Sequence, residues 1–591
     1  MTAKEAGDVD SPWLAGGAFS APAGAARTAG VWHAPGSQVR VMTAGTVGAV
    51  IAGVCPADDA EVSRTAVAVA SGRPEAITGM SGSYWMAVHD SERKRTVVAG
   101  DLAEGRGVFT ARTDRGPVWA TDAATLAAQL GRGPDLELLV ARITVGSAEH
   151  WPERSVWSGI ERVPGGHALI LDEAGTRTVD VRLRPDGRSL EAGAEEVGAA
   201  LWAATQGYAH AAGPRVSADL SGGLDSSAVV IAAAAVRPVM AVTYGGPLAD
   251  STDTRLARQV AQYVGAEHHI SSGGNGTAHF SRWPHTRPHA PVLPVSSYPL
   301  DADYLPPARG FSAVHLTGHG GDVVLESSTA AWTALAQDGQ TRRARAAVTA
   351  LARRVNTAPG PLWRVVREGA RGRPSALYRA AEAVAQGRLL GHGLGVWTWC
   401  PIGPATRWLT PTGREAVAGM LAHSGHAVGD VDAGEWDDWS ALRYNGSAMR
   451  DSEPLSAEHG VRQVSPFLDN DVVRACLRIG AGERRRPDSY KPLLALARAD
   501  LPGWLTGRQS KGHFTPLLYE GLRARRPELH RVIDASELVN RGLIDPAVVH
   551  AALDEAAAGV GRPPLPALES FLITSWWLDR TRSPAPEEGA R

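Results

Sequence analysis

From about residue 196 to residue 318, short apolar segments alternate with segments of helical character, and this alternation constrains the possible folds most strongly. Residues 216–220, 239–245, 267–271 and 312–318 are predicted strands, and helices are predicted between the first three of them. Strand–helix alternation of this kind is typical of a parallel sheet that binds its ligand at the carboxyl ends of the strands. We therefore expect an α/β domain in this part of the chain.

The first 185 or so residues have a different pattern, in which short strand-like segments are separated by turn residues. This pattern is typical of an antiparallel β-meander, so the whole chain is predicted to combine α/β with α+β architecture. The predicted elements are strands at 83–90, 95–101, 107–113 and 116–122, a helix at 124–130, a strand pair within 156–172 that turns at Pro164, Gly165 and Gly166, and a last strand near 177–183.

The polar stretch 184–196 predicts a junction between these two parts. We expect a β-rich domain over 1–190 and an α/β domain over 191–580, of which about 330–579 is mainly helical. The Pro- and charge-rich residues 581–591 are predicted to form a flexible tail.

Composition excludes several classes of protein. The 60 basic and 62 acidic residues leave a net charge of -2, which argues against a protein that coats nucleic acid or an anionic membrane. The three cysteines are too few and too scattered for a disulfide framework or a zinc site, and the longest apolar run, Ala228–Val236, is far shorter than the roughly 20 residues that span a bilayer. The start of the chain does not resemble a signal peptide. We expect a reduced, cytoplasmic protein without a membrane span or a nucleic-acid partner.

Lysine is rare in this chain. Only Lys4, Lys94, Lys491 and Lys511 are lysines among the 60 basic residues, so arginine supplies a cation nearly everywhere else. A compact ammonium does work that a planar guanidinium cannot do. The four lysines are therefore candidates for specific roles.

The loop over 221–226 carries the strongest chemical signal. Gly222 and Gly223 let the backbone approach an anion, and the helix that follows directs free N–H groups and its positive end at that anion. Ser221 and Ser226 can add hydroxyl donors, whereas Asp225 requires a divalent cation between itself and a phosphate. The alternative is a glycine turn with an Asp or Ser helix cap. The full string in its strand–loop–helix setting favours a phosphate site.

This loop resembles the pyrophosphate loop of ATP pyrophosphatases that adenylate a substrate, and it is most similar to asparagine synthetase and its relatives. The resemblance covers nearly the whole chain and implies an N-terminal class II glutamine amidotransferase-like sandwich followed by an ATP-pyrophosphatase synthetase domain with a parallel sheet and extra helices. The segments that carry the resemblance are LTGHGGD at 316–322, HGVRQVSPFLD at 459–469, SYKPLLALARADLPGWLTGRQSKGHF at 489–514, GDLAEGRGVFTART at 100–113 and GIERVPGGHALILD at 159–172.

The resemblance also implies cofactors and site residues. ATP and Mg²⁺ are the expected cofactors, with Asp225 and Asp322 as the metal-binding carboxylates. Lys491 corresponds to a catalytic lysine, and Lys511 is an expected second phosphate contact. The residues implied to hold the nucleotide are Leu220, Ser221, Gly222, Gly223, Asp225, Ser226, Val242, Thr317 and Gly318.

Two departures from asparagine synthetase narrow the expected activity. Position 2 is Thr2, where glutamine-using enzymes have the nucleophilic cysteine, so we expect an inactive amidotransferase-like domain and an amine supplied by the substrate. His319 stands where asparagine synthetase has Glu and β-lactam synthetases have Tyr, and the TGHGGD form resembles lasso peptide macrolactam cyclases. His319 is then a candidate proton acceptor, or else it orders the loop or contacts substrate.

The cyclase resemblance implies a precursor core peptide as substrate, with a leader peptidase and a leader-recognition protein as partners. The alternatives are a β-lactam synthetase-like or ammonia-dependent amide ligase, and a non-catalytic nucleotide-binding scaffold. Among other polar residues, Arg450, Asp451, Glu453 and Glu458 are candidate helpers near the acyl pocket, whereas His268, His269, His285 and His289 are predicted to lie at strand ends and in loops rather than to bind a metal.

Overall fold

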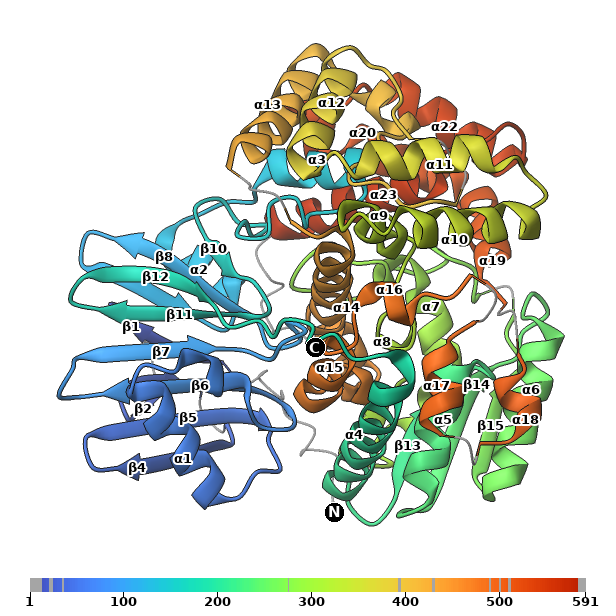
Figure 1. Cartoon of the computed structure of the whole chain (residues 1–591). Coiled ribbons are helices and arrows are strands. Elements are labelled where there is room, and N and C mark those ends of the chain that lie inside the picture. Colours follow the sequence, from blue (N-terminus) through green and yellow to red (C-terminus); the bar gives the residue numbers. More distant parts are fainter. Residues whose placement is uncertain are drawn as a thin grey trace, which may run out of the picture. The chain divides into compact units, whose positions relative to one another are not determined.

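The structure is a computed structural model of the chain (Figure 1). It divides into two compact units, and each unit is assembled from separated stretches of sequence. Unit 1 contains Met1–Asp135, Pro152–Leu183 and Leu468–Val473, and unit 2 contains Leu136–Trp151, Arg184–Phe467 and Arg474–Arg591. The residues described are 13–20, 25–34, 37–274, 276–391, 395–427, 431–487, 490–498, 501–508 and 512–582.

Unit 1 contains two six-stranded sheets in which every neighbouring pair of strands is antiparallel. In order across the first sheet, the strands are β10 (Glu161–Val163), β8 (Val108–Thr113), β9 (Gly116–Ala120), β1 (Leu14–Gly17), β3 (Val31–His33) and β2 (Ala26–Thr28). Across the second sheet they are β12 (Gly175–Asp180), β11 (His167–Asp172), β7 (Arg95–Ala99), β6 (Ser83–Asp90), β5 (Val47–Val54) and β4 (Val39–Ala44).

The four strands predicted over 83–122 are present, but the prediction that they form one meander is wrong. Strands β6 and β7 pair in the second sheet, whereas β8 and β9 pair in the first. The chain crosses between the sheets in the connection from Ala99 to Val108, which begins at Gly100, where a Cβ atom would lie 1.5 Å from the carbonyl oxygen of Arg106. Alternation along a strand predicts the strand itself, but it contains no information about which sheet the strand joins.

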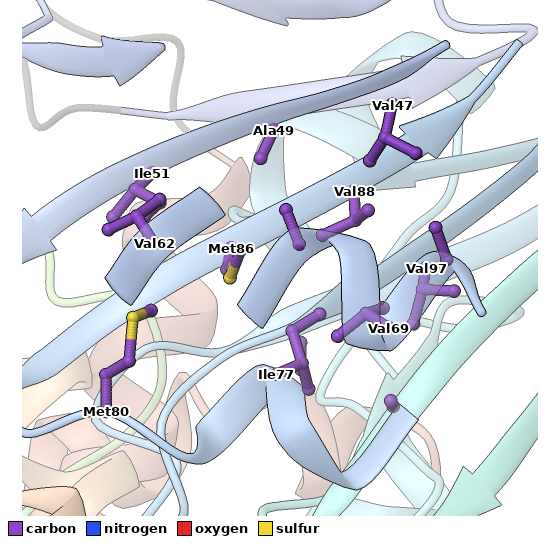
Figure 2. Packing of buried hydrophobic residues seen from close by; sticks show 14 of the residues in the cluster. Val47, Ala49, Ile51, Val62, Val69, Ile77, Met80, Met86, Val88 and Val97 are labelled. Carbon is purple, nitrogen blue, oxygen red and sulfur yellow. The ribbon is translucent and has the colours of Figure 1, made fainter. Parts of the chain in front are cut away.

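Strand β6 is buried on both faces, because its alternate side chains point to opposite sides of the sheet. Trp85 and Ala87 lie in a core formed by both sheets, which makes unit 1 a sandwich. Met86 and Val88 lie in a second core that helix α1 (Asp59–Ala70) and the short helix η1 (Pro74–Thr78) cover, as Figure 2 shows for Val62, Val69 and Ile77.

Unit 2 contains a five-stranded sheet in which all neighbouring strands are parallel. The strand order is β15 (Glu267–Ser271), β14 (Val239–Tyr244), β13 (Val216–Asp219), β16 (His315–Leu316) and β17 (Gln463–Val464). The chain proceeds from β13 outwards in one direction and then returns to place β16 on the other side of β13. This reversal next to β13 is a topological switch point, where ligands of such sheets bind.

The predicted parallel sheet is therefore confirmed, and so is the mainly helical character of the region from about 330. The helices of the α/β part are α4 (Leu190–Ala211), α5 (Leu224–Ala234), α6 (Ser251–Val264), α7 (Pro294–Tyr304) and α8 (Gly321–Val324). Those of the C-terminal region are α9 (Ala330–Gln337), α10 (Thr341–Arg354), α11 (Pro359–Gly369), α12 (Arg373–Ala385), α13 (Pro411–Ala427), α14 (Ala433–Glu458), α15 (Asn470–Leu477), α16 (Ala481–Arg484), α17 (Pro492–Ala497), α18 (Gly503–Thr506), α19 (Thr515–Ala524), α20 (Arg526–Asp534), α21 (Glu537–Asn540), α22 (Pro546–Ala558) and α23 (Leu565–Arg582).

The two units do not divide the chain at one point near residue 190. Helix α2 (Ala123–Leu130) belongs to unit 1, but α3 (Leu136–Val145) belongs to unit 2, and the chain returns to unit 1 at Leu468–Val473. Residues 583–591 of the predicted tail lie outside the described residues. No helix in the described part of the chain has the length and apolar character needed to cross a bilayer.

Candidate active site

The loop over 221–226 joins the end of β13 to the start of α5 at the switch point. Gly222 has a φ of +75°, and a Cβ atom there would lie 2.2 Å from the carbonyl oxygen of Asp253, so the position requires glycine. Gly223 is the N-cap of α5, and no side chain caps the helix. The helix start therefore keeps backbone N–H groups for an external anion, contrary to the Asp or Ser cap that was the alternative interpretation.

The two serines of this loop bond to each other across it. The hydroxyl oxygens of Ser221 and Ser226 are 3.0 Å apart, and the amide of Ser221 donates to Ser226 Oγ at 3.1 Å. The amide of Gly223 also donates to Ser221 Oγ, at 3.3 Å. These bonds hold the loop in a closed turn, so its shape is set before any ligand binds.

A second loop, after β16, packs directly on the first. A Cβ atom on Gly318 would lie 2.6 Å from the backbone nitrogen of Ser226, and one on Gly321 would lie 2.5 Å from Cγ of Asp225. Both positions therefore need glycine because of close approach. The predicted residues Thr317 and Gly318 are brought to the same edge of the sheet as the 221–226 loop.

Lys491 joins the two loops through their carboxylates. Its ammonium nitrogen lies 2.6 and 2.5 Å from the two carboxylate oxygens of Asp225, and 2.6 Å from Oδ1 of Asp322. The Lys491 side chain is 2% exposed, whereas that of Asp322 is 67% exposed. These three residues, predicted from widely separated motifs, are thus in direct contact.

The electrostatic balance at Lys491 favours the charged form. Burial alone would lower the pKa of its ammonium, but the neighbouring carboxylates of Asp225 and Asp322 outweigh burial and raise the pKa above its ordinary value. Lys491 also has a left-handed backbone, with φ 49° and ψ 55°, directly before α17. A non-glycine residue in that conformation is uncommon and is held there by its surroundings.

His319 lies in the second loop and is partly buried. Its ring nitrogen Nε2 is 3.2 Å from the carbonyl oxygen of Asn445, so Nε2 carries the proton in this contact. Its own carbonyl oxygen accepts a bond from Ser465 Oγ at 2.5 Å, and its amide donates to Thr317 Oγ1 at 3.3 Å. These bonds order the loop, and the role of His319 as a proton acceptor stays a prediction.

Leu220 directly follows β13, Val242 lies in the neighbouring strand β14, and both side chains are buried. The amide of Leu220 donates to the carbonyl of Val242 at 2.9 Å, and Thr243 Oγ1 donates to the Leu220 carbonyl. Their contacts with nucleotide stay a prediction. Thr2 and Lys511 lie outside the described residues.

Two functional candidates, Arg508 and Asp253, were missed by the sequence analysis. The guanidinium of Arg508 donates both to the carbonyl of Gly222 and to the Asp253 carboxylate, which also accepts the amide of Gly512 at 3.1 Å. Arg508 therefore attaches its own segment to the 221–226 loop. It lies within the 489–514 motif, but a pairing of residues 286 positions apart leaves no signal in local spacing.

The candidate helpers on α14 are occupied by local contacts. Glu458 accepts the hydroxyl of Tyr298 at 2.6 Å and the amides of His285 and Thr286 at 3.2 and 3.1 Å. Arg450 Nε donates to Asp451 Oδ1 at 2.9 Å, and Glu453 lies on the same helix. Glu458 thus organises a loop.

The histidine pairs lie in a strand and in loops. His268 and His269 belong to β15, where their Nε2 atoms lie 2.8 Å from Thr243 Oγ1 and 2.6 Å from Glu267 Oε1 respectively. The amide of His289 donates to the carbonyl of Asp451 at 3.0 Å. These contacts are structural ones.

The site fits a hard divalent cation. Asp225 and Asp322 direct three oxygen atoms at one cationic nitrogen, and that nitrogen shows where a cation is stabilised between them. Carboxylate oxygen is the ligand type that Mg²⁺ prefers. Within the described residues, no group of three or more His, Cys, Asp or Glu side chains is arranged to hold a metal, so further ligands would come from phosphate or water.

Two solved structures are distantly similar to the chain. Glutamine phosphoribosylpyrophosphate amidotransferase from B. subtilis, complexed with ADP and GMP, is similar over 40% of this chain and 48% of that chain, at 10% identity and a TM-score of 0.18. The allosteric regulatory enzyme of purine biosynthesis is similar over 41% of this chain and 64% of that chain, at 11% identity and a TM-score of 0.17. Both likenesses span less than two thirds of the other protein and are too weak to support an argument.

None of the curated proteins is significantly similar to the chain in sequence. The profile of the asparagine synthase family matches residues 199–579, which include the 221–226 loop, Asp322 and Lys491. Because this match covers more than half of the sequence, the chain belongs to the asparagine synthase family.

Proposed function

We propose that the chain is an ATP- and magnesium-dependent lasso peptide cyclase. It adenylates the side-chain carboxylate of an Asp or Glu in a core peptide and joins it to the N-terminal amine of the same peptide. The observation that carries the proposal is the convergence of Asp225, Asp322 and Lys491 beside an uncapped helix start. Family membership supports the ATP-dependent ligase, and the TGHGGD loop with His319 supports the cyclase.

The reaction needs activation because a carboxylate has no good leaving group. A carboxylate oxygen attacks the α-phosphorus of ATP, the bond to the bridging oxygen breaks, and pyrophosphate leaves with that electron pair. The amine nitrogen then attacks the acyl carbon, the acyl–oxygen bond breaks, and AMP leaves. One proton from the amine passes to a base, and the net products are a macrolactam, AMP and pyrophosphate.

Different residues of this chain contribute to adenylation and to amide formation. Amide groups at the start of α5 bind the pyrophosphate, and Arg508 holds the 221–226 loop in shape. Asp225 and Asp322 would hold Mg²⁺, which supplies positive charge for the departing pyrophosphate. Lys491 stabilises negative charge on the α-phosphate and on the tetrahedral oxygen, and His319 accepts the amine proton.

The proposal is tested with the purified chain, ATP, Mg²⁺ and synthetic core peptides with a free amine and one Asp or Glu at varied ring distances. We expect pyrophosphate release together with a peptide product lighter by one water. Asp225→Asn should abolish both signals, whereas Lys94→Met should retain them, because Lys94 forms an exposed pair with Glu173 in unit 1. Turnover only with free aspartate and ammonia, or only with small β-amino acids, would identify the alternative ligases. Absence of pyrophosphate release with any substrate would support a scaffold.

The proposal also implies that a leader peptidase and a leader-recognition protein deliver the core peptide. A pull-down with tagged wild-type chain and the products of neighbouring genes checks this partner class. Efficient cyclisation of a peptide that still carries its leader would contradict it, because the attacking amine must be free.

A further inference from the structure

Lys491 occupies the position that the proposed function assigns to a metal ion, and this inference rests on that function. Its ammonium makes three contacts of 2.5–2.6 Å with the carboxylate oxygens of Asp225 and Asp322. A magnesium ion centred among the same three oxygens, at the roughly 2.1 Å typical of its oxygen ligands, would lie where the ammonium lies. The residue expected to act on phosphate therefore neutralises the metal ligands instead.

We propose that Lys491 is a resting-state plug of the metal site. In the nucleotide-free protein its ammonium excludes divalent metal, and metal enters only together with the nucleotide phosphates. The phosphates give the ammonium a new anionic partner, so its departure from the carboxylates leaves no buried charge unpaired. Loading of the metal and activation of Lys491 then become one event.

The charges at the site explain this exclusion. The ammonium offsets part of the negative charge of the two carboxylates, so they attract a divalent ion less strongly while the ammonium stays at contact distance. Removal of the ammonium would restore two negative charges to a partly buried site. Nucleotide phosphates also restore the attraction for metal. They add negative charge to the site, so the metal ion can bind the carboxylates while the Lys491 ammonium pairs with phosphate.

The geometry allows the ammonium to move while its backbone stays fixed. The left-handed conformation of Lys491 and the helix that begins at Pro492 hold its backbone, but a lysine side chain rotates about four bonds. The open side of the site is at Asp322, whose side chain is 67% exposed. Metal with phosphate can therefore approach from that side as the ammonium leaves.

Mn²⁺ serves as the probe, because its free form has a strong electron paramagnetic resonance signal. In the absence of nucleotide, we expect wild-type protein to bind Mn²⁺ weakly, and Lys491→Met to bind it about tenfold or more tightly. Addition of a non-hydrolysable ATP analogue should cause wild-type protein to bind Mn²⁺ tightly. Lys94→Met, which removes a lysine from an exposed ion pair, should behave as wild type.

Lys491→Gln is included in case Lys491→Met fails to fold, because glutamine retains a polar side chain. Lys491→Met combined with Asp225→Asn should lose the affinity for Mn²⁺ that Lys491→Met gains. Equal Mn²⁺ affinity of nucleotide-free wild type and both Lys491 variants would overturn the plug. None of these measurements uses a peptide, so failure of cyclisation alone would refute the proposed function and leave the plug intact.

Discussion

At the scale of single residues, Gly321 is the position where the smallest change should do the most damage. A Cβ atom there would lie 2.5 Å from Cγ and 2.7 Å from Oδ1 of Asp225, whose carboxylate is already held by Lys491. Gly321→Ala should therefore displace the carboxylate and lower ATP-dependent pyrophosphate release by about 100-fold, since an error near 1 Å in an active site costs that much. Pyrophosphate release and thermal unfolding measure the two effects separately.

Gly419→Ala is the matched control, because a Cβ atom on Gly419, in helix α13, meets no atom within 4 Å. That variant should keep full activity and be slightly more stable, as alanine in a helix usually is. If Gly321→Ala retained wild-type activity, pyrophosphate release would not depend on the observed position of the Asp225 carboxylate.

Motifs in the sequence indicate candidate site residues but not the contacts between them. The motifs indicate Asp225, Asp322 and Lys491, but their convergence follows from long-range folding, since Asp225 and Lys491 lie 266 positions apart. The sequence gives Lys511 more weight than Arg508, because lysine is rare in this arginine-rich chain. Burial and hydrogen bonding make Arg508 important, and neither property is visible in composition.

At the scale of elements, the Arg508–Asp253 pair should hold the 221–226 loop in place. The side chains are 6% and 19% exposed, and Arg508 also binds the carbonyl of Gly222. Arg508→Ala leaves that carbonyl and the carboxylate without the guanidinium, so we expect a loss of about 3 kcal/mol in the free energy of unfolding and a KM for ATP raised about tenfold. Denaturant unfolding and initial rates measure both.

The Arg526–Asp554 pair is a suitable control, since its side chains are 51% and 41% exposed. Arg526→Ala should change the free energy of unfolding far less than Arg508→Ala and leave the KM for ATP unchanged. Equal effects of the two substitutions would show that the Arg508 contact is not specific to the loop.

His150 should make the packing of the C-terminal helices sensitive to acid. Its ring stacks on Trp436 of α14 at 5.4 Å, and its carbonyl accepts bonds from Arg373 of α12 and Ser424 of α13. Burial, with a smaller contribution from Arg373, lowers the pKa of His150 from 6.5 to about 3. Between pH 6.5 and about 3, the His150 imidazole is therefore neutral in the folded state but protonated in the unfolded chain.

The sign of the effect follows from that lowered pKa. Stability contributed by the neutral ring is fully present above pH 6.5 and is lost as pH falls towards 3, by up to about 1.4 kcal/mol per pH unit. His150→Phe keeps an aromatic ring but cannot titrate, so its unfolding free energy should fall less steeply across this range. Denaturant unfolding at several pH values gives both slopes, and identical slopes would refute a buried neutral imidazole.

Among the elements, those with strong periodicity were predictable and the shortest were not. Strand β14 was found from its apolar run, but the predicted strand 312–318 forms ladder pairs only at His315 and Leu316. Strand β17 consists of two residues, Gln463 and Val464, and exists only because it pairs with β16. Such strands are defined by their partners, so no local pattern indicates them.

At the scale of the whole molecule, the chain completes unit 1 with a segment from its C-terminal part. Asn470, in the Leu468–Val473 segment, is fully buried. Its amide donates to the Gly82 carbonyl at 3.1 Å, its Oδ1 accepts the Leu102 amide at 2.9 Å, and its Nδ2 donates to the Met80 carbonyl at 3.4 Å. The sequence predicts a β-rich domain over 1–190 that does not include Leu468–Val473. Asn470 bonds to backbone atoms of unit 1, and backbone atoms are the same for every residue type, so the sequence pattern does not indicate this contact.

Asn470→Ala should destabilise unit 1 by about 1–3 kcal/mol, because it leaves the Leu102 amide buried without its acceptor. In the intact chain, hydrogen exchange at Leu102 should be slow in the wild type and clearly faster in the variant. Asn540→Ala is the control, since Asn540 makes one exposed bond of 3.5 Å to the carbonyl of Ala535. Unchanged exchange at Leu102 in Asn470→Ala would mean that unit 1 closes without this segment. Faster exchange would mean that a fragment ending near residue 190 lacks part of its own fold, so any activity of the β-rich unit has to be measured in the full chain.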